Sequence, residues 1–322
     1  MKLSELGEFG FIERIRQAVA KAPGVAVGIG DDCAVLELPP GERLLTSTDL
    51  LIEDVHFRRE WTDMGLLGRK SVSVNVSDIA AMGGTPRYLY LGLGIPDGLA
   101  VEELDAFVAG FLSACADYGA TLVGGDTCRS PGPLLISVTV EGTVPAAELV
   151  CRSGARPGDA VYVSGTLGGS ALALRRLLAG ETPDAEAAGR HHDPRARVEL
   201  GRALAAAGIP SSMIDVSDGL LADLGHLLEA SGVGAEIDES ALPLSEALQA
   251  SLIDAPNSIE LALSGGEDYE LLFTVPPERE SLLAALAVPV TRIGRIVLAA
   301  GLAVKQRSGT LRPASPAGYN HF

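Results

Sequence analysis

The stretch "SMIDVSDGLLADLGHLLEASG", residues 212–232, indicates the fold class of the second half of the chain. A short aliphatic run ends near Asp215, and a Ser-Asp-Gly turn leads into a segment whose leucines recur at helical spacing. The same order appears upstream, where "AVYVSG" (160–165) precedes the helical "GGSALALRRLLAG" (168–180). This alternation of strand and helix predicts α/β layering.

The first half of the chain has a different texture. Six short runs rich in aliphatic and β-branched residues predict strands, at 25–30, 34–38, 43–52, 87–95, 121–126 and 134–144. Helices are predicted over 4–21 and 101–119, where apolar residues follow a 3.6-residue rhythm. We therefore place a domain boundary near residue 145, which predicts domains 1–145 and 146–322. Residues 181–194 are predicted to form an acidic loop.

Composition limits the classes of partner. The 322 residues include 42 acidic and 25 basic side chains, a net charge of −17, which disfavours nucleic acid or an anionic membrane surface as the partner. The four cysteines form no CxxC pair, and no apolar stretch has membrane-spanning length. We expect a reduced, cytoplasmic protein. Anionic small molecules remain possible partners if metal ions bridge them to the chain.

The segment "SVSVNVSDIAAMGG", residues 71–84, gives conflicting signals. Three valines alternate with polar residues, which by periodicity alone indicates a strand. The following "IAAMGG" is typical of a helix end. The pattern leaves both alternatives open.

Acidic residues stand beside Gly, Ser or Thr in six short motifs, several of them at the end of a predicted strand. These are "GIGDD" (28–32), "STD" (47–49), "NVSD" (75–78), "GGDT" (124–127), "IDVSDG" (214–219) and "SGGEDYE" (264–270). Any one alone is best interpreted as a turn or a helix N-cap. Six carboxylate motifs converging on one site would repel each other unless hard cations lay between them. Together they predict a magnesium polyphosphate site.

The common nucleotide-binding motifs are absent from the sequence, which contains no GxxxxGK[ST], no complete GxGxxG and no paired HRD and DFG. Basic residues near the acidic motifs are few. Arg152, in "CRSGARPGD", is the candidate for a bidentate phosphate contact, and a plain surface arginine is an equally good interpretation.

Eight strings of this sequence resemble, in order and spacing, the thiamine-monophosphate kinase family. They are "GIGDDCAVL", "STDLLIEDVHF", "KSVSVNVSDIAAMGGTP", "LVGGDT", "RSGARPGD", "MIDVSDGLLADLGHL", "LSGGEDYELLFTV" and the terminal "GYNHF". That family belongs with aminoimidazole-ribonucleotide synthetase, selenophosphate synthetase and a hydrogenase-maturation protein. The resemblance implies ATP-dependent phosphorylation of thiamine monophosphate to the diphosphate, with several Mg²⁺ ions.

The resemblance also implies a fold. It is a two-domain, aminoimidazole-ribonucleotide synthetase-like α/β (α+β) fold with an ATP- and Mg²⁺-binding N-terminal domain. Its N-terminal sheet pairs with that of a second copy in a homodimer, and the C-terminal domain is α/β. Residues 71–78 would then be helical, against their period-2 pattern.

Site residues are carried over by position. The implied metal ligands are Asp32, Ser47, Thr48, Asp49, Asp78, Asp126, Asp215 and Asp218, with Asp31 less certain. The implied ATP contacts are Tyr118, Gly125, Asp126, Arg152 and Ser217, and the implied contacts to the thiamine substrate are His56, Glu267 and Tyr319. Arg152 and Asp126 would assist transfer. No general base is expected, because a phosphate monoester is largely ionised at neutral pH.

One position departs from the family pattern, and two alternatives remain. An aromatic residue is expected a few positions before the terminal "GY", where this chain has Pro316, and this puts stacking against the substrate rings in doubt. A relative acting on another phosphate acceptor is the first alternative. The second is a non-catalytic divalent-cation-binding protein, although no D-x-D-x-D-G loop of an EF-hand is present.

Overall fold

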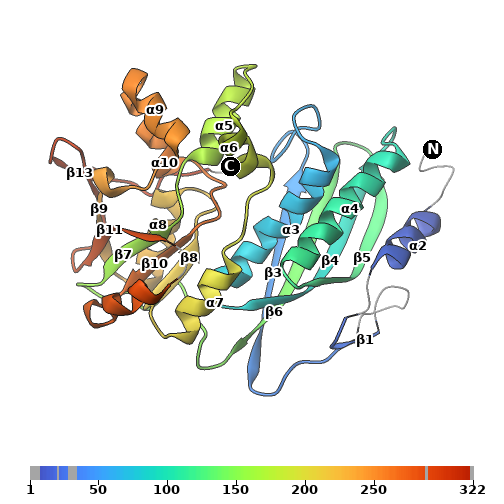
Figure 1. The fold of residues 1–322 in the computed structure, drawn as a ribbon, viewed down its shortest axis with the longest axis horizontal. Coiled ribbons are helices and arrows are strands. Elements are labelled where there is room, and N and C mark those ends of the chain that lie inside the picture. Colours follow the sequence, from blue (N-terminus) through green and yellow to red (C-terminus); the bar gives the residue numbers. More distant parts are fainter. Residues whose placement is uncertain (1–7, 20–21, 28–34, 287–288, 320–322) are drawn as a thin grey trace. The chain divides into compact units, whose positions relative to one another are not determined.

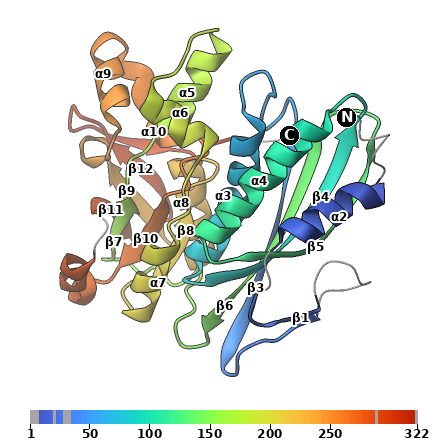
Figure 2. The same ribbon diagram turned by 45° about the vertical axis from the view of Figure 1, so that its right-hand side comes forward.

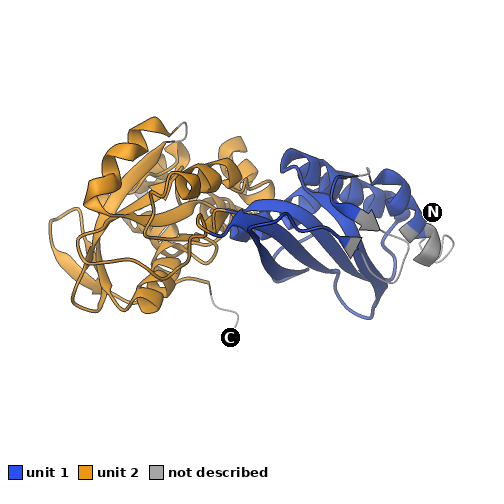
Figure 3. Ribbon diagram, turned by 90° about the horizontal axis from the view of Figure 1, so that it is seen from below, with its two compact units in different colours: residues 1–79, 84–146 blue, residues 80–83, 147–322 orange. Residues whose placement is uncertain are grey.

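The structure is a computed structural model that describes residues 8–19, 22–27, 35–286 and 289–319. The predictions at Asp31 and Asp32 lie outside the described residues. The chain forms two compact units, residues 1–79 with 84–146 and residues 80–83 with 147–322 (Figure 3). Each unit has its own sheet and is described by itself.

The first unit is built on a four-stranded sheet in the order β3-β6-β4-β5. Its strands are β3 (Glu42–Ile52), β4 (Thr85–Pro96), β5 (Thr121–Ser130) and β6 (Leu135–Pro145). Pairing is antiparallel except between β4 and β5. Helices α3 (Met64–Ala81) and α4 (Val101–Asp117) cover one face of the sheet (Figures 1 and 2). The short ladder β1 (Val25–Val27) with β2 (Val35–Leu36) and helix α2 (Glu8–Ala18) complete the unit.

Helix α3 contains the segment whose periodicity indicated a strand. The strand interpretation is wrong, and the helix implied by the family resemblance is correct. Residues 71–77 are all buried, the serines and Asn75 as fully as the valines. The polar residues therefore do not mark a solvent-exposed face of the helix. Two of the polar side chains bond within the helix, where Ser71 Oγ donates to the Leu67 carbonyl at 2.7 Å and Asn75 Nδ2 to that of Ser71 at 2.9 Å.

The second unit contains a seven-stranded sheet in the order β13-β12-β9-β11-β7-β10-β8. The strands are β7 (Ala160–Ser164), β8 (Ser212–Asp215), β9 (Gly234–Asp238), β10 (Leu271–Val275), β11 (Val290–Val297), β12 (Gly301–Lys305) and β13 (Leu311–Ala314). Among the described strands of this sheet, β9 and β12 are the parallel pair. The mixed helices and sheets confirm the α/β (α+β) class. In open parallel α/β sheets, ligands bind at the carboxyl ends of the strands. Most neighbouring strands of this sheet are antiparallel, so that rule does not locate a site here.

Helices surround this sheet. They are α5 (Gly169–Leu178), α6 (Ala185–His192), α7 (Val198–Ala206), α8 (Leu220–Ser231), α9 (Glu246–Asp254) and α10 (Glu260–Ser264), with 3₁₀ turns at Glu239–Ala241, Pro256–Ile259 and Pro277–Ala285. Helix α6 lies in the stretch predicted to be a loop, so that prediction is wrong. Asp184 caps the helix by accepting from the Ala187 amide at 3.0 Å, a signal present in the sequence.

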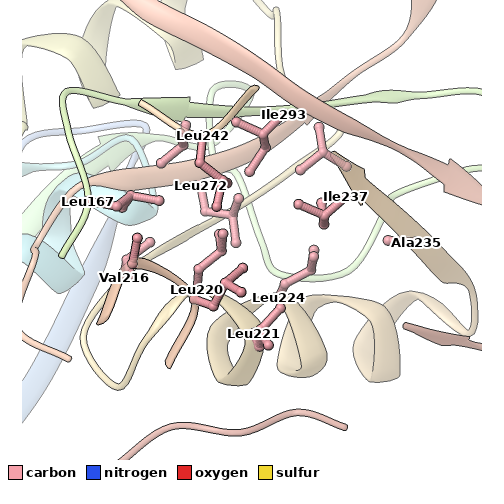
Figure 4. Packing of buried hydrophobic residues seen from close by; sticks show 14 of the residues in the cluster. Leu167, Val216, Leu220, Leu221, Leu224, Ala235, Ile237, Leu242, Leu272 and Ile293 are labelled. Atoms are coloured by element: carbon pink, nitrogen blue, oxygen red, sulfur yellow. The ribbon is translucent and has the colours of Figure 1, made fainter. Parts of the chain in front are cut away.

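The core of the second unit lies between α8 and the sheet. Leu220, Leu221 and Leu224 of α8 point toward Leu272 of β10 and Ile237 of β9, all almost fully buried (Figure 4). Burying one such side chain contributes about 1.5–3 kcal/mol. This packing fixes the start of α8, and with it the Ser-Asp-Gly turn. Across the described ranges, no helix combines the length and apolarity needed to span a bilayer.

Candidate functional site

In the first unit, predicted ligands gather on the sheet face covered by α3. Ser47 and Asp49 lie on the same face of β3 as the buried Leu45 and Leu51. Ser47 Oγ donates to Asp78 Oδ2 of α3 at 2.5 Å, and the Asp49 amide donates to Asn75 Oδ1 at 3.2 Å. The structure thus brings Ser47, Asp49 and Asp78 to one place. The side-chain atoms that could bind a metal ion there are oxygens.

Thr48 does not join them. It faces the opposite side of the sheet, where its Oγ1 lies 2.8 Å from Thr139 Oγ1. Leu44 and Leu50 lie on that same side and are each 50% exposed. This side is called the outer face below.

Asp126 lies on the outer face at the far edge of the sheet. The register runs from Asp49 to Val138 of β6, then to Leu91 of β4 and Gly125 of β5, so three strand spacings separate the two edges. At about 4.8 Å per spacing this is about 14 Å. Since Mg²⁺ holds its oxygens at about 2.1 Å, Asp49 and Asp126 of one chain are too far apart to bind the same ion.

Gly125 has a structural role that explains its residue type. A Cβ atom there would lie 2.0 Å from the Leu91 carbonyl oxygen, so any side chain would clash with the neighbouring strand. Tyr118, at the end of α4, is partly buried, and its hydroxyl lies 3.0 Å from Ser73 Oγ of α3. The structure therefore ties Tyr118 to α3.

His56 lies in the turn after β3 and is partly buried. The Ile52 amide donates to its Nδ1 at 3.0 Å, and its own amide donates to the Ile52 carbonyl at 2.9 Å. Because Nδ1 accepts a hydrogen bond, the neutral ring carries its proton on Nε2. Asp54 in the same turn has φ of 69°, so this backbone is held in a left-handed conformation.

In the second unit, the turn between β8 and α8 is organised around one buried carboxylate. Asp223 Oδ2 accepts from the amides of Ser217, Asp218 and Gly219 at 3.0, 3.1 and 3.1 Å. Burial first, and then the nearby charge of Asp218, raise the pKa of Asp223 to about 7. Asp215, the last residue of β8, is buried at 3% exposure.

Glu267 and Tyr319 reach this turn through their backbones. The Glu267 amide donates to the Ser217 carbonyl at 2.7 Å, and the Tyr319 amide donates to the Asp218 carbonyl at 2.9 Å. The structure therefore brings together Ser217, Asp218, Glu267 and Tyr319. Pro316 lies against α8, since a Cβ atom added to Gly225 of that helix would be 2.6 Å from the Cβ of Pro316.

Arg152 lies at the other end of α8. Its carbonyl accepts from the hydroxyl of Ser231, the last residue of that helix, at 3.3 Å, and its side chain is exposed. Helix α8 has 12 residues, which at 1.5 Å per residue span about 18 Å. The structure does not bring Arg152 to the Ser217 turn within this unit.

No group of three or more His, Cys, Asp or Glu side chains in the described part of the chain is arranged to hold a metal ion alone. The carboxylates and hydroxyl near α3 still fit Mg²⁺ by type, because this ion takes oxygen ligands and completes its shell with water and phosphate. Such a site needs few protein ligands per ion.

Both units match known sequence families. Residues 30–144 match the AIR synthase related protein N-terminal domain, and residues 156–306 match the corresponding C-terminal domain. The thiamine-monophosphate kinase of Haemophilus influenzae is 41% identical over 302 residues, covering 90% of this chain and 89% of the relative. This chain belongs to the thiamine-monophosphate kinase family.

Solved structures agree with the family assignment. The crystal structure of thiamine-monophosphate kinase from Stenotrophomonas maltophilia K279a superposes with a TM-score of 0.84 at 38% identity, covering 96% of this chain and 98% of that one. The structure of AaThiL complexed with AMPPCP and TMP gives a TM-score of 0.79 at 39% identity, covering 100% of this chain and 99% of that one.

Within this member of the family, the structure adds residues that sequence reasoning missed. Glu270 is fully buried and accepts from Arg190 Nη1 at 2.8 Å, from Arg197 Nε at 2.6 Å and from Ser164 Oγ at 2.6 Å. Asp223 was also missed. The sequence did contain a signal for Asp223. It is an acidic residue in the first turn of α8, and it follows a turn whose three amides need hydrogen-bond acceptors. No local pattern marks Glu270, because its partners are distant in sequence.

Proposed function

We propose that this chain transfers the γ-phosphoryl group of ATP to thiamine monophosphate with Mg²⁺ bound beside Ser47, Asp49 and Asp78. Family membership supports the ATP-dependent kinase activity. The observation that carries the metal proposal is the oxygen-only donor set on one sheet face, where Ser47 and Asp78 are hydrogen-bonded at 2.5 Å. In the second unit, Asp215 and Asp218 would supply further ligands beside the Ser217 turn.

The obstacle to this reaction is charge. The acceptor oxygen belongs to an anionic phosphate and must approach an anionic γ-phosphate. Two unit charges about 4 Å apart repel by about 4 kcal/mol at an effective dielectric near 20. When bound, Mg²⁺ neutralises phosphate charge between the substrates and the carboxylates.

The chain's own residues bind and orient. The acceptor phosphate is largely ionised at neutral pH, so no side chain has to remove a proton from it. His56 and Glu267 would contact the thiamine part, with Tyr319 nearby. Arg152 and the Ser217 turn would contact different parts of the nucleotide, because the length of α8 separates them.

We further propose that the site is completed by a second copy of the chain. Asp49 and Asp126 lie on opposite edges and faces of one sheet, so a shared ion would need Asp49 of one copy and Asp126 of the other. The outer face supports a contact between two copies, because Leu44 and Leu50 are half exposed there, beside Thr48. Gly125, Asp126 and Tyr118 would then contact ATP near the dimer interface. Use of ATP favours a cytoplasmic location.

An acceptor panel tests the proposal. Purified protein is incubated with ATP, Mg²⁺ and either thiamine monophosphate or other phosphate monoesters, and products are separated by chromatography. We expect thiamine diphosphate to form, and to disappear when EDTA removes the divalent ion. Phosphorylation of a different monoester in preference to thiamine monophosphate would favour the alternative of another acceptor. ATP and Mg²⁺ binding without turnover of any acceptor would favour a cation-binding protein.

A further inference from the structure

Two side chains from separate helices of the second unit meet at the carboxylate of Glu267. His191 of α6 and Ser170 of α5 are buried, at 5% and 1% exposure. His191 Nδ1 lies 2.9 Å from Ser170 Oγ and 3.2 Å from Glu267 Oε2, and Ser170 Oγ donates to Glu267 Oε2 at 3.4 Å. One oxygen of Glu267 therefore lies close to both His191 and Ser170.

The backbone of Glu267 is already fixed by other contacts. Its φ of 67° is left-handed and that of Tyr269 is 49°, conformations that side-chain-bearing residues rarely adopt. Hydrogen bonds hold them there, from the Glu267 amide to Ser217 at 2.7 Å and from the Tyr269 amide to Val216 at 2.8 Å. The remaining freedom of Glu267 lies in its side-chain torsions, and these are what His191 and Ser170 restrict.

The position of His191 is itself set by a buried ion network. The preceding residue, Arg190, donates to Glu270 at 2.8 Å and to Thr166 Oγ1 at 3.0 Å. Glu270 is fully buried and is also held by Arg197. An anchored, buried charge of this kind is costly to displace, so α6 presents His191 to Glu267 in one orientation.

We propose that His191 is a positioning residue for Glu267 and thereby sets the affinity for the phosphate acceptor. The inference rests on the proposed function, in which Glu267 contacts the thiamine part of the substrate. With its proton on Nδ1, His191 directs this N–H toward both Ser170 Oγ and Glu267 Oε2, and the Ser170 hydroxyl donates to the same Glu267 oxygen. Orienting the carboxylate in advance removes the cost of ordering it when the substrate binds. ATP binding does not depend on this contact.

The test compares three substitutions. His191→Leu removes the donor at similar volume, and His191→Asn keeps an amide nitrogen where Nδ1 stood. Glu186→Gln, at an exposed position of the same helix, is the control. We expect His191→Leu to raise KM for thiamine monophosphate about 10-fold, the effect of losing a hydrogen bond to a charged group, while KM for ATP and the melting temperature stay near wild type. His191→Asn should recover most of the affinity, and Glu186→Gln should change neither KM.

A double variant shows whether His191 acts through Glu267. If it does, His191→Leu added to Glu267→Gln should raise KM for the acceptor no further than Glu267→Gln alone. Independent, multiplicative losses would overturn the inference. So would a His191→Leu variant with unchanged acceptor KM, or one that loses melting temperature and both affinities without recovery by Asn. If His191→Leu does not fold, His191→Gln replaces it, with the same expectation, because its amide lies one bond further out.

Wild-type turnover separates the two proposals. An active wild type with an unaltered His191 variant overturns the positioning role alone. A wild type that forms no thiamine diphosphate overturns the proposed function, and the positioning role with it.

Discussion

Asp49 and Asp126 stand on strands whose backbones are fixed by pairing, so an amide in place of either carboxylate changes charge with little change of shape. If they hold Mg²⁺, Asp49→Asn and Asp126→Asn should each lower kcat by at least about 100-fold, because charge neutralisation in the transition state is lost. Asp97→Asn, at an exposed position, is the control. Near-normal turnover of either variant at saturating Mg²⁺ would mean that the residue has a structural role only and does not hold the metal ion.

His56 permits a finer separation of roles, because its two ring nitrogens do different things. Nδ1 accepts from the Ile52 amide, and in the proposed function Nε2–H contacts thiamine monophosphate. His56→Asn keeps an acceptor at the Nδ1 position and removes Nε2. We expect it to raise KM for thiamine monophosphate several-fold without lowering the melting temperature.

His56→Gln supplies the opposite change, since it keeps a donor near Nε2 and loses the Nδ1 acceptor. It should lower thermal stability more than His56→Asn does, by about 1 kcal/mol in the unfolding free energy. The substrate role of His56 would be wrong if only the melting temperature responded in both variants.

At the scale of elements, the start of α5 depends on a buried carboxyl group. Asp268 accepts from the amide of Gly168, the N-cap residue just before α5, at 2.8 Å. Burial raises the pKa of Asp268 from 3.8 to about 8. A raised pKa means that the folded state binds the proton more tightly, so the unfolding free energy falls as pH rises from about 4 to about 8.

Asp268→Asn keeps the acceptor for Gly168 and cannot titrate. The melting temperature, measured from pH 5 to 8.5, should therefore fall less steeply for Asp268→Asn than for the wild type. Equal slopes for the two proteins would show that Asp268 is ionised in the folded protein throughout this range.

Helices and strands were predicted from the sequence where burial of one face produces a periodic pattern of apolar residues. The strands β3, β4 and β6 and the helices α4 and α8 follow their apolar periods, since each has one face on a core. Strand β7 was predicted from a short apolar run, because it is buried on both faces. Helix α3 does not follow a helical period, because residues 71–77 are all buried and its buried serines find hydrogen-bond partners, such as the Leu67 carbonyl for Ser71. Helix α6 was missed because a short acidic stretch resembles a loop until its Asp184 cap is noticed.

The site was only partly accessible to sequence reasoning for a similar reason. Motif residues Ser217, Asp218 and Glu267 do meet in the second unit, and Ser47 meets Asp78 in the first. The residues that hold them, Asp223 and Glu270, act through contacts that only the fold reveals. The separation of Asp49 from Asp126 likewise follows from strand order, which no single motif encodes.

For the whole molecule, strand order makes a prediction about assembly. If Asp49 of one copy and Asp126 of the other share a site, mixing inactive Asp49→Asn and Asp126→Asn chains should restore activity. Random pairing gives half hybrids, each with one intact site, so about a quarter of wild-type activity should return. Mixtures that stay inactive after subunit exchange, verified by a tagged copy, would place both residues in one chain's site or in none.

The most direct measurement follows the γ-phosphate itself. The protein is given ATP labelled in the γ-phosphate, Mg²⁺ and thiamine monophosphate, and the label is located by separating the products. Direct transfer predicts that the label appears as the terminal phosphate of thiamine diphosphate, with one labelled molecule for each ADP formed. Label released as free phosphate while ADP accumulates, with none in thiamine diphosphate, would contradict the assignment of this chain as a kinase for thiamine monophosphate.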